Sequence, residues 1–321
     1  MLAVDVGATK TRIALLDSKD MKLLRKEVIR TPQEGDEDVV AGIIAEVAEH
    51  LITSLGLSGV VAVGVGTIGP LDIKRGCVVN PPNVRLRAFS LREPLVKRFN
   101  VPTYVVNDCV AAVYAEYMSG VGVGRDNVVY ITISSGIGAG VIVDGHLILG
   151  KDGNAHEIGH LVVSYDSNIR CGCGGVGHWE ALASGNNLWK FIGLLRDRWR
   201  GDSELYRLTS STEVQAETLF RYWREGDDFA AYVVSELAKV DAAGIASVIN
   251  AYDPEVISFG GSVMLNNPEF LALVLNHVDT YVTNRMPEAV VTRFGDDVVL
   301  YGAAWIAHKP PKELTRIQEQ T

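Results

Sequence analysis

The chain opens with Leu2-Ala3-Val4-Asp5-Val6-Gly7-Ala8-Thr9-Lys10, and the apolar run Thr11 to Leu16 follows. Two apolar runs around a short polar break predict a strand, a tight loop and a returning strand. Within six residues the loop offers a carboxylate (Asp5), a glycine whose N–H can approach an anion (Gly7), a hydroxyl (Thr9) and an amine (Lys10). These are the parts of a magnesium-phosphate site, although such hairpins also occur as simple turns. The segment is not a Walker loop, because no Gly-Lys-Ser/Thr opens a helix here.

The second half of the chain repeats this arrangement. Val128 to Ile133 predicts a strand, Ser134-Ser135-Gly136-Ile137-Gly138 a glycine-rich loop, and Ala139 to Val143 the returning strand. Such a loop can turn several backbone N–H groups toward phosphate oxygens, or it can be a simple bend. Two halves with the same opening predict a duplicated α/β architecture with a ligand-binding cleft between two lobes.

Two weaker glycine signals lie near the C-terminus. Gly260-Gly261 follows the predicted strand Glu255 to Phe259, and Gly302 follows a second predicted strand, Val298 to Tyr301. Farther upstream, Ser90 with Glu93 three residues later predicts a capping box at the start of a short helix.

Composition limits the class of protein. Of 321 residues, 47% are hydrophobic and 21% charged, which predicts a globular chain of two domains or one bilobed domain. The 30 Lys and Arg against 39 Asp and Glu give a net charge of −9, so we expect no nucleic-acid partner. No apolar run reaches the ~18 residues of a membrane span, and the start lacks a signal peptide's basic region. We therefore expect a cytoplasmic protein that acts on a small molecule.

Asn107-Asp108 lies where the predicted strand Thr103 to Val106 meets a predicted helix. Asp108 could be the N-cap of that helix, since aspartate is favoured there. It could equally be a functional carboxylate at a strand end, and the residues alone leave both interpretations open.

His156-Glu157-Ile158-Gly159-His160 satisfies the His-Glu-x-x-His pattern of zinc proteases, which requires a helix. We reject the protease, because Gly159 weakens a helix and Leu161-Val162-Val163 is typical of a strand. A better metal set is Cys171, Cys173 and His178 with His160 upstream, since two thiolates and two imidazoles form a closed tetrahedral zinc site. A metal-free loop is the alternative, and His156 is a possible substitute ligand.

In this order the motifs resemble those of the ROK family of sugar kinases and repressors. The resemblance is carried by Asp5 to Lys10, Asn107-Asp108, Ser135 to Gly140, His156 to His160, Cys171 to Glu180, Gly260-Gly261 and Gly302-Ala303. It implies a two-lobed actin and hexokinase type (ribonuclease H-like) fold. We expect a small lobe of residues 1–118, completed by a C-terminal helix at about 303–321, and a large lobe of residues 119–302 that carries the zinc loop and a helical insertion.

The resemblance also implies roles for individual residues. Asp108 would be the catalytic base, Mg²⁺ would bridge the ATP phosphates near Asp5, and structural Zn²⁺ would order the metal loop. The family has a third cysteine where this chain has His178, so that ligand is a departure. The implied sugar-binding residues are Asn83, Asn107, Asp108, Glu157, His160 and Glu180. The implied ATP-binding residues are Asp5, Gly7, Thr9, Lys10, Ser135, Gly136, Ile137, Gly138, Gly260, Gly261 and Gly302.

The sequence therefore predicts an ATP-dependent sugar kinase that phosphorylates the 6-hydroxyl of a hexose, either a glucokinase or a broad hexokinase, and works as a homo-oligomer, expected to be a dimer. The alternative substrates are N-acetylmannosamine, N-acetylglucosamine and fructose. A sugar-responsive repressor is the alternative outside the enzymes. Such repressors carry a helix-turn-helix ahead of the first phosphate loop, and with that loop starting at Asp5 we expect none here.

Overall fold

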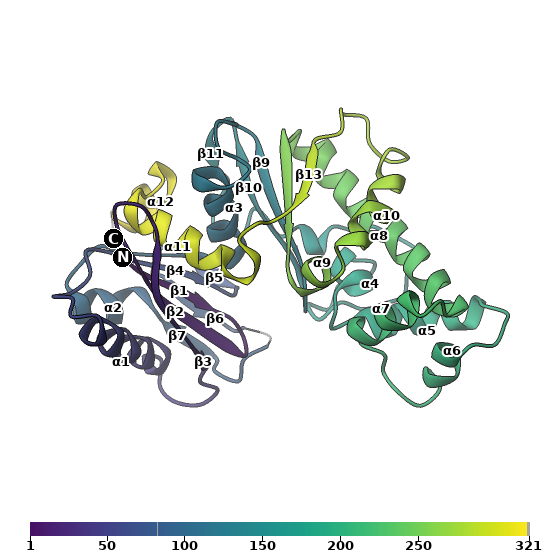
Figure 1. Ribbon diagram of the computed structural model, residues 1–321, viewed down its shortest axis with the longest axis horizontal. Helices are drawn as coiled ribbons and strands as arrows, with labels where there is room; N and C mark the ends of the chain where they lie inside the picture. The colour runs from purple at the N-terminus through teal and green to yellow at the C-terminus, as the bar shows by residue number, and fades with distance from the viewer. Residues whose placement is uncertain (82, 320–321) are drawn as a thin grey trace. The chain divides into compact units, whose positions relative to one another are not determined.

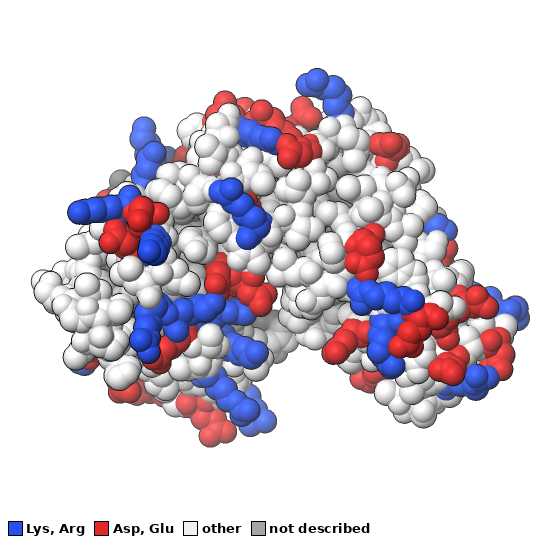
Figure 2. Space-filling view, viewed as in Figure 1, with Lys and Arg blue, Asp and Glu red and all other residues white. Residues whose placement is uncertain are grey.

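A computed structural model describes residues 1–81 and 83–319. The chain divides into two compact units. Unit 1 comprises Met1–Tyr130, Gly140–His156 and Arg293–Thr321, and unit 2 comprises Ile131–Ala139 and Glu157–Thr292. Among the described residues, no helix combines the length and the hydropathy that crossing a membrane requires. On the face drawn in Figure 2, acidic and basic side chains are interspersed.

Unit 1 is built on a five-stranded sheet with the order β3-β2-β1-β4-β8. β1 pairs with β2 antiparallel and with β4 parallel, and β4 pairs with β8 parallel. The carboxyl ends of β1, β4 and β8 therefore meet at one edge, where Val6 pairs with Thr67 and Thr67 with Asn107. The strands are β1 (Leu2–Val6), β2 (Lys10–Leu16), β3 (Leu23–Arg30), β4 (Val63–Thr67) and β8 (Thr103–Asn107).

Helices cover both faces of this sheet, with α1 and α2 on one side and α3 and α11 on the other (Figure 1). A small antiparallel sheet of β5, β6 and β7 adds to the unit. The bounds are α1 (Val39–Ser54), β5 (Leu71–Asp72), β6 (Cys77–Val79), β7 (Ala88–Ser90), α2 (Arg92–Phe99), α3 (Asp108–Ser119), η2 (Gly295–Asp297), α11 (Val298–His308) and α12 (Lys312–Gln318).

A second five-stranded sheet has the order β11-β10-β9-β12-β13. Its hairpin β10–β11 turns through Asp144 and Gly145, whose φ angles of 51° and 73° fit the left-handed turn that the Asp-Gly pair predicts. The strands are β9 (Val128–Ile133), β10 (Ile137–Val143), β11 (His146–Leu147), β12 (Val256–Gly260) and β13 (Glu288–Val291).

This sheet is shared between the two units, and the remainder of unit 2 is mostly helical. The longest helix, α8, ends at Tyr252, and Asp253 before Pro254 is its left-handed C-cap. The Asp-Pro pair predicts a helix end at this point. The helices are η1 (Ile158–His160), α4 (Trp179–Ala183), α5 (Leu188–Arg198), α6 (Glu204–Leu208), α7 (Ala216–Arg224), α8 (Asp228–Tyr252), α9 (Ser262–Asn266) and α10 (Pro268–Val278).

Three local predictions were wrong. Val298 to Tyr301 is the first turn of α11, because these apolar residues continue into Gly302 to Ala307 as one helix packed on β1 and β4. The capping box does not form: Ser90 ends β7, and Leu91 precedes α2 without a side-chain cap. Leu161 to Val163 forms no strand, only one isolated bridge between Val162 and His178.

Candidate active site and metal site

The first hairpin of unit 1 places its functional groups at the carboxyl edge of the parallel strands. The turn after β1 is closed by Gly7 N–H donating to the Lys10 carbonyl at 3.0 Å, which leaves Thr9 and Lys10 exposed at its tip. Asp5 is buried, and its Oδ2 lies 2.7 Å from Nη1 of Arg12. Ligands of open α/β sheets bind outside the carboxyl ends of the strands, so this edge is a suitable phosphate site.

Arg12 is a site residue that the sequence reasoning missed. It stands directly opposite Asp5 in the antiparallel pair β1–β2. A hairpin that pairs Val6 with Thr11 must pair Asp5 with Arg12, so the hairpin register alone predicts that these two residues are neighbours. Burial raises the pKa of Asp5 to about 7, even though the Arg12 guanidinium opposes the shift, and the nearby Asp108 carboxylate raises it further.

Asp108 is the first residue of α3, and Asn107 is the N-cap. The Asn107 side chain accepts a hydrogen bond from Cys109 N–H at 2.9 Å. The capping interpretation of Asp108 is therefore wrong, although its Oδ1 also accepts from Cys109 N–H at 2.8 Å. Burial raises the pKa of Asp108. A carboxylate with a raised pKa is a stronger proton acceptor, as general-base catalysis requires.

The charges of Asp5 and Asp108 are both affected by burial, and Asp5 also by its ion pair with Arg12. Both carboxyl groups have a raised pKa because burial penalises their charge, and the charge of Asp108 adds to the shift of Asp5. A divalent cation favours the ionised form of both, and oxygen ligands are those that Mg²⁺ prefers. The Asp5 carboxyl group therefore has the donor chemistry of a magnesium ligand.

Two predicted residues of unit 1 have other surroundings. Gly302 lies in the middle of α11, where a Cβ would be 1.7 Å from the carbonyl oxygen of Ala111 on α3. The glycine thus allows two helices to touch, and its assignment to the nucleotide stays a prediction. Asn83 is exposed and follows Pro82, which lies outside the described residues.

In unit 2 the glycine-rich loop lies beside the second predicted glycine segment. Ser134 Oγ is 3.1 Å from Ser262 Oγ, and a Cβ on Gly261 would be 2.5 Å from the Ile133 carbonyl oxygen. The structure therefore places the end of β9 and the first residue of the glycine-rich loop against Gly261 and Ser262.

Glu180 joins this loop to the metal loop. Its Oε2 accepts a hydrogen bond from Ile137 N–H at 3.0 Å, and its Oε1 lies 3.5 Å from Cys171 Sγ. One N–H that we expected to face phosphate thus donates to a carboxylate. A Cβ on Gly136 would lie 2.7 Å from Oε2, so a side chain at that position would displace the Glu180 carboxylate.

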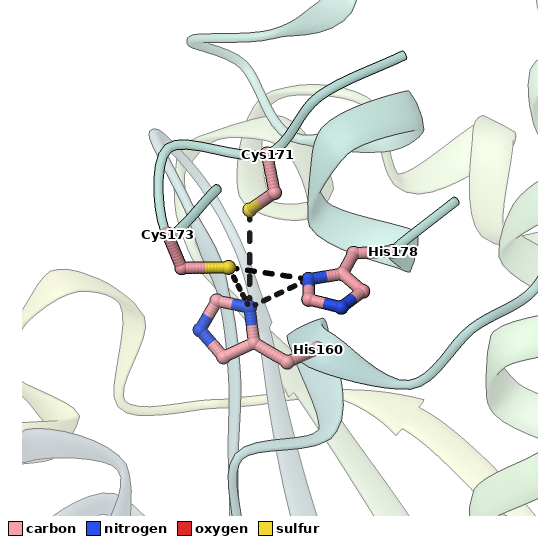
Figure 3. A group of neighbouring side chains, drawn as sticks. All are labelled: His160, Cys171, Cys173 and His178. Atoms are coloured by element: carbon pink, nitrogen blue, oxygen red, sulfur yellow. Dashed lines mark hydrogen bonds between the residues drawn. The ribbon is translucent and has the colours of Figure 1, made fainter. Parts of the chain in front are cut away.

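Four side chains of unit 2 point their ligand atoms at one another (Figure 3). They are His160, Cys171, Cys173 and His178, and their ligand atoms all lie within 4.8 Å. The two Nδ1 atoms are 3.3 Å apart, and Cys173 Sγ is 3.6 Å from His160 Nδ1 and 3.3 Å from His178 Nδ1. Tetrahedral zinc with ordinary bond lengths requires roughly 3.3 Å between two nitrogens and roughly 3.6 Å between nitrogen and sulfur.

The surroundings of the four side chains also favour a metal. Nε2 of His160 lies 3.6 Å from the Glu157 carboxylate, so one ring nitrogen faces the cluster and the other a carboxylate, as is usual for metal-bound histidine. Burial and the neighbouring His160 lower the pKa of His178, which favours the neutral, ligating imidazole.

His156 is outside this group. It is buried, and its Nε2 lies 3.0 Å from the Gly153 carbonyl oxygen. Residues 158–160 form a single 3₁₀ turn, so the helix that a His-Glu-x-x-His protease needs does not form.

Known proteins resemble this chain in sequence and in fold. The family model of the ROK family matches residues 1–310. The glucokinase of Pyrobaculum calidifontis is 41% identical over 316 residues, which cover 98% of this chain and 97% of that protein. The ROK hexokinase of Thermus thermophilus superposes with a TM-score of 0.81 at 34% identity, covering 96% of this chain and 97% of that one. A ROK glucokinase of Streptomyces griseus, solved with glucose and AMPPNP, gives 0.75 at 29%, covering 96% and 99%.

The chain belongs to the ROK family. Its predicted fold, the two-lobed α/β fold of actin and hexokinase type, is confirmed.

Proposed function

We propose that the protein is an ATP-dependent kinase that transfers the γ-phosphoryl group to the 6-hydroxyl of a hexose, and that glucose is its principal substrate. One observation carries the proposal: the half-buried Asp108 and the buried Asp5 lie on a helix and a strand that meet at the carboxyl edge of the parallel strands, where the charge of Asp108 raises the pKa of Asp5. The names of its relatives, glucokinases and a hexokinase, support it.

In this proposal Asp108 accepts the proton of the sugar hydroxyl as that oxygen attacks the γ-phosphorus. Phosphoryl transfer depends mainly on positioning and charge neutralisation, so an oriented carboxylate beside a cation site is sufficient protein chemistry. The Asn107 cap on α3 holds the backbone next to Asp108. Asn83, Glu157, His160 and Glu180 complete the proposed sugar-binding set.

Asp5 would hold Mg²⁺, which when bound neutralises charge on the phosphates. Thr9 and Lys10 at the exposed turn would contact the phosphates directly. Ser135 to Gly138 and Gly260-Gly261 would bind the rest of the nucleotide; the contact between Ser134 and Ser262, beside both segments, supports this.

We further propose that His160, Cys171, Cys173 and His178 bind one structural Zn²⁺. The fit rests on the interatomic spacings and on the mixed thiolate and imidazole donors. Zinc there would order the segment between Glu157 and Glu180, since metal binding and local folding are coupled.

The proposal also covers the division into lobes, the oligomeric state and the cellular location. It includes a small lobe of residues 1–118 with 303–321, of which the last two lie outside the described residues, and a large lobe of residues 119–302. It also includes a homodimer in the cytoplasm.

An ADP-release assay with Mg²⁺ and ATP over glucose, mannose, fructose, N-acetylglucosamine and N-acetylmannosamine tests the function. We expect the highest kcat/KM for glucose. A higher value for an N-acetylated hexosamine or for fructose would replace the substrate assignment. Sugar binding without turnover of any member would replace the kinase by a sugar-responsive binding protein.

A further inference from the structure

Asp241, on α8, has an unusual environment. It is fully buried, its Oδ1 accepts a hydrogen bond from Trp179 Nε1 at 2.7 Å, and its Oδ2 has no hydrogen-bond partner among the described residues. Burying a carboxyl group without complete hydrogen bonding is costly, and most buried polar groups are satisfied. An isolated buried carboxyl group therefore calls for an explanation.

Trp179, the hydrogen-bond partner of Asp241, is adjacent in the chain to one candidate metal ligand and to one proposed sugar-binding residue. Trp179 is the first residue of α4 and stands between the metal-site residue His178 and the proposed sugar-binding residue Glu180. The Trp179 side chain is fully buried, and the backbone N–H of Trp179 donates to the backbone carbonyl of Leu161 at 2.9 Å. This hydrogen bond joins the main chain directly after His160 to the main chain directly after His178.

α4 cannot fix its own orientation. The helix has five residues, and isolated helices of that length are unstable in water. Its N-cap, His178, makes no side-chain capping hydrogen bond. The direction of Glu180 must therefore come from the packing and hydrogen bonding of the residues around it.

α8 provides a shaped surface for the indole. Gly244 follows Asp241 by three residues, so both lie on one face of the helix. A Cβ on Gly244 would lie 2.2 Å from Trp179 Cδ2, which means that the ring rests directly on the helix backbone. Apolar contact alone lets a flat ring slide or turn in its plane, whereas a hydrogen bond at Nε1 fixes that rotation.

We infer that Asp241 is a positioning residue for the proposed hexose site: as the acceptor for the Trp179 indole, it fixes the first turn of α4 and with it the Glu180 carboxylate. The inference rests on the proposed function, since it assigns Glu180 to the sugar. Glu180 also accepts from Ile137 N–H at 3.0 Å, so a rotation of α4 changes the glycine-rich loop as well.

The role requires an acceptor and not a negative charge. Burial raises the pKa of Asp241 to about 7, so the neutral carboxyl group is accessible near neutral pH. An amide oxygen can accept the same hydrogen bond. Asp241→Asn should therefore preserve positioning even where it changes stability, and Asp241→Leu, of similar volume, should not.

The experiment compares these two variants in the full-length protein. We expect Asp241→Leu to raise the glucose KM roughly fivefold or more, the effect of one ordinary hydrogen bond, with the ATP KM within about twofold of wild type. Asp241→Asn should keep both constants within about twofold. Trp179→Phe removes the donor and should repeat the effect of Asp241→Leu, and the double variant should be no worse than either single one.

Hydrogen exchange of the peptide spanning Trp179–Ala183 gives a readout that does not depend on turnover. It should quicken in Asp241→Leu and stay near wild type in Asp241→Asn. The matched control is Asn250→Ala on the same helix, which removes hydrogen bonds to Tyr281 and Thr283. This control should lower the melting temperature and leave both the exchange in α4 and the glucose KM unchanged.

The outcomes separate the two proposals. A wild-type protein without hexose phosphorylation overturns the proposed function, and exchange in α4 then still decides whether Asp241 positions the helix. Equal exchange and equal glucose KM in the Leu and Asn variants overturn the inference. If Asp241→Leu does not fold, Trp179→Phe against Asp241→Asn makes the same decision.

Discussion

The hairpin β1–β2, which lies in unit 1, and the hairpin β9–β10, whose turn lies in unit 2, share a small glycine-containing turn but differ in where their charge comes from. The first has its own carboxylate, Asp5, its own counter-ion, Arg12, and an exposed Lys10 at its tip. The second, residues 128–143, contains no charged side chain at all. Its carboxylate is Glu180, which reaches the Ile137 N–H from α4, 43 residues along the chain.

The first hairpin thus contains its charged groups within fifteen consecutive residues, whereas the second receives its carboxylate from a segment that the tertiary structure brings to it. The metal loop, α4 and the contact between Trp179 and Asp241 all contribute to placing Glu180. We therefore expect the chemistry of the first region to respond to changes within it and that of the second to respond to distant changes.

The largest effect should come from Asp108→Asn, which tests whether unit 1 carries the catalytic step. The amide is isosteric and can still accept from Cys109 N–H, so α3 should stay intact. We expect kcat to fall by ~10² to 10⁴, the range that loss of a general base usually costs, with hexose binding almost unchanged. Steady-state kinetics and calorimetry with glucose measure the two quantities.

The control is Asp36→Asn, the same substitution at an exposed carboxyl group of unit 1 outside the proposed site, and it should leave kcat unchanged. A kcat for Asp108→Asn equal to that of wild type would reduce Asp108 to a structural residue at the start of α3.

Metal removal should have the next largest effect, and it tests whether the second region is assembled from a distance. We expect about one zinc per chain, measured by elemental analysis of protein purified without a metal-binding tag. Cys173→Ser should weaken zinc retention at least as much as loss of an outer-shell partner does, roughly 10- to 100-fold, and should raise the glucose KM.

Cys77→Ser is the matched control, since Cys77 is buried in unit 1 outside the metal group. It should leave the zinc content at wild-type level. Protein without stoichiometric zinc or another transition metal would contradict the site.

Glu157→Gln should have a smaller effect. Glu157 is proposed to accept hydrogen bonds from sugar hydroxyls, and a hydrogen bond to a charged group contributes ~1.5 to 3 kcal/mol. The glucose KM should therefore rise ~10-fold or more, with little change in the ATP KM. If the glucose KM stays constant, or if both constants rise together, the assignment of Glu157 to the sugar is wrong.

The same contrast explains how far the sequence could be followed. The hairpins and the clustering of the four candidate metal ligands were predictable, because strand alternation, short loops and close spacing of these residues are local properties. The start of α3 was less so, since Asn107 and Asp108 are both good caps and only the backbone shows which one caps. α11 was missed because Val298 to Tyr301 is a short apolar run, which suits a strand as well as a buried helix.

Contacts between distant segments could not be predicted from spacing. Nothing in the sequence near Trp179 indicates that its indole meets Asp241, 62 residues away. Arg12 is the opposite case, since the hairpin register alone places it opposite Asp5.

The smallest effect we predict, taken over one pH unit, is a slope of stability against pH that each region contributes through one buried carboxyl group. Burial raises the pKa of Asp5 in unit 1 and of Asp241 in unit 2 to about 7, from an ordinary value of 3.8. Between about pH 4 and pH 7 the folded protein therefore binds these protons more tightly than the unfolded chain does. The free energy of unfolding must fall as pH rises through this window, by at most ~1.4 kcal/mol per pH unit for each group.

Asp5→Asn and Asp241→Asn should each flatten this slope, as measured by denaturant unfolding at intervals from pH 4 to pH 8. Magnesium and a nucleotide distinguish the two, because a cation at Asp5 favours its ionised form and should remove the Asp5 share while leaving the Asp241 share. A wild-type curve parallel to that of Asp5→Asn would mean that Arg12 keeps Asp5 ionised throughout. Arg12 would then balance the charge of Asp5 without a metal. The two buried carboxyl groups would differ in ionisation, although burial alone predicts similar pKa values for both.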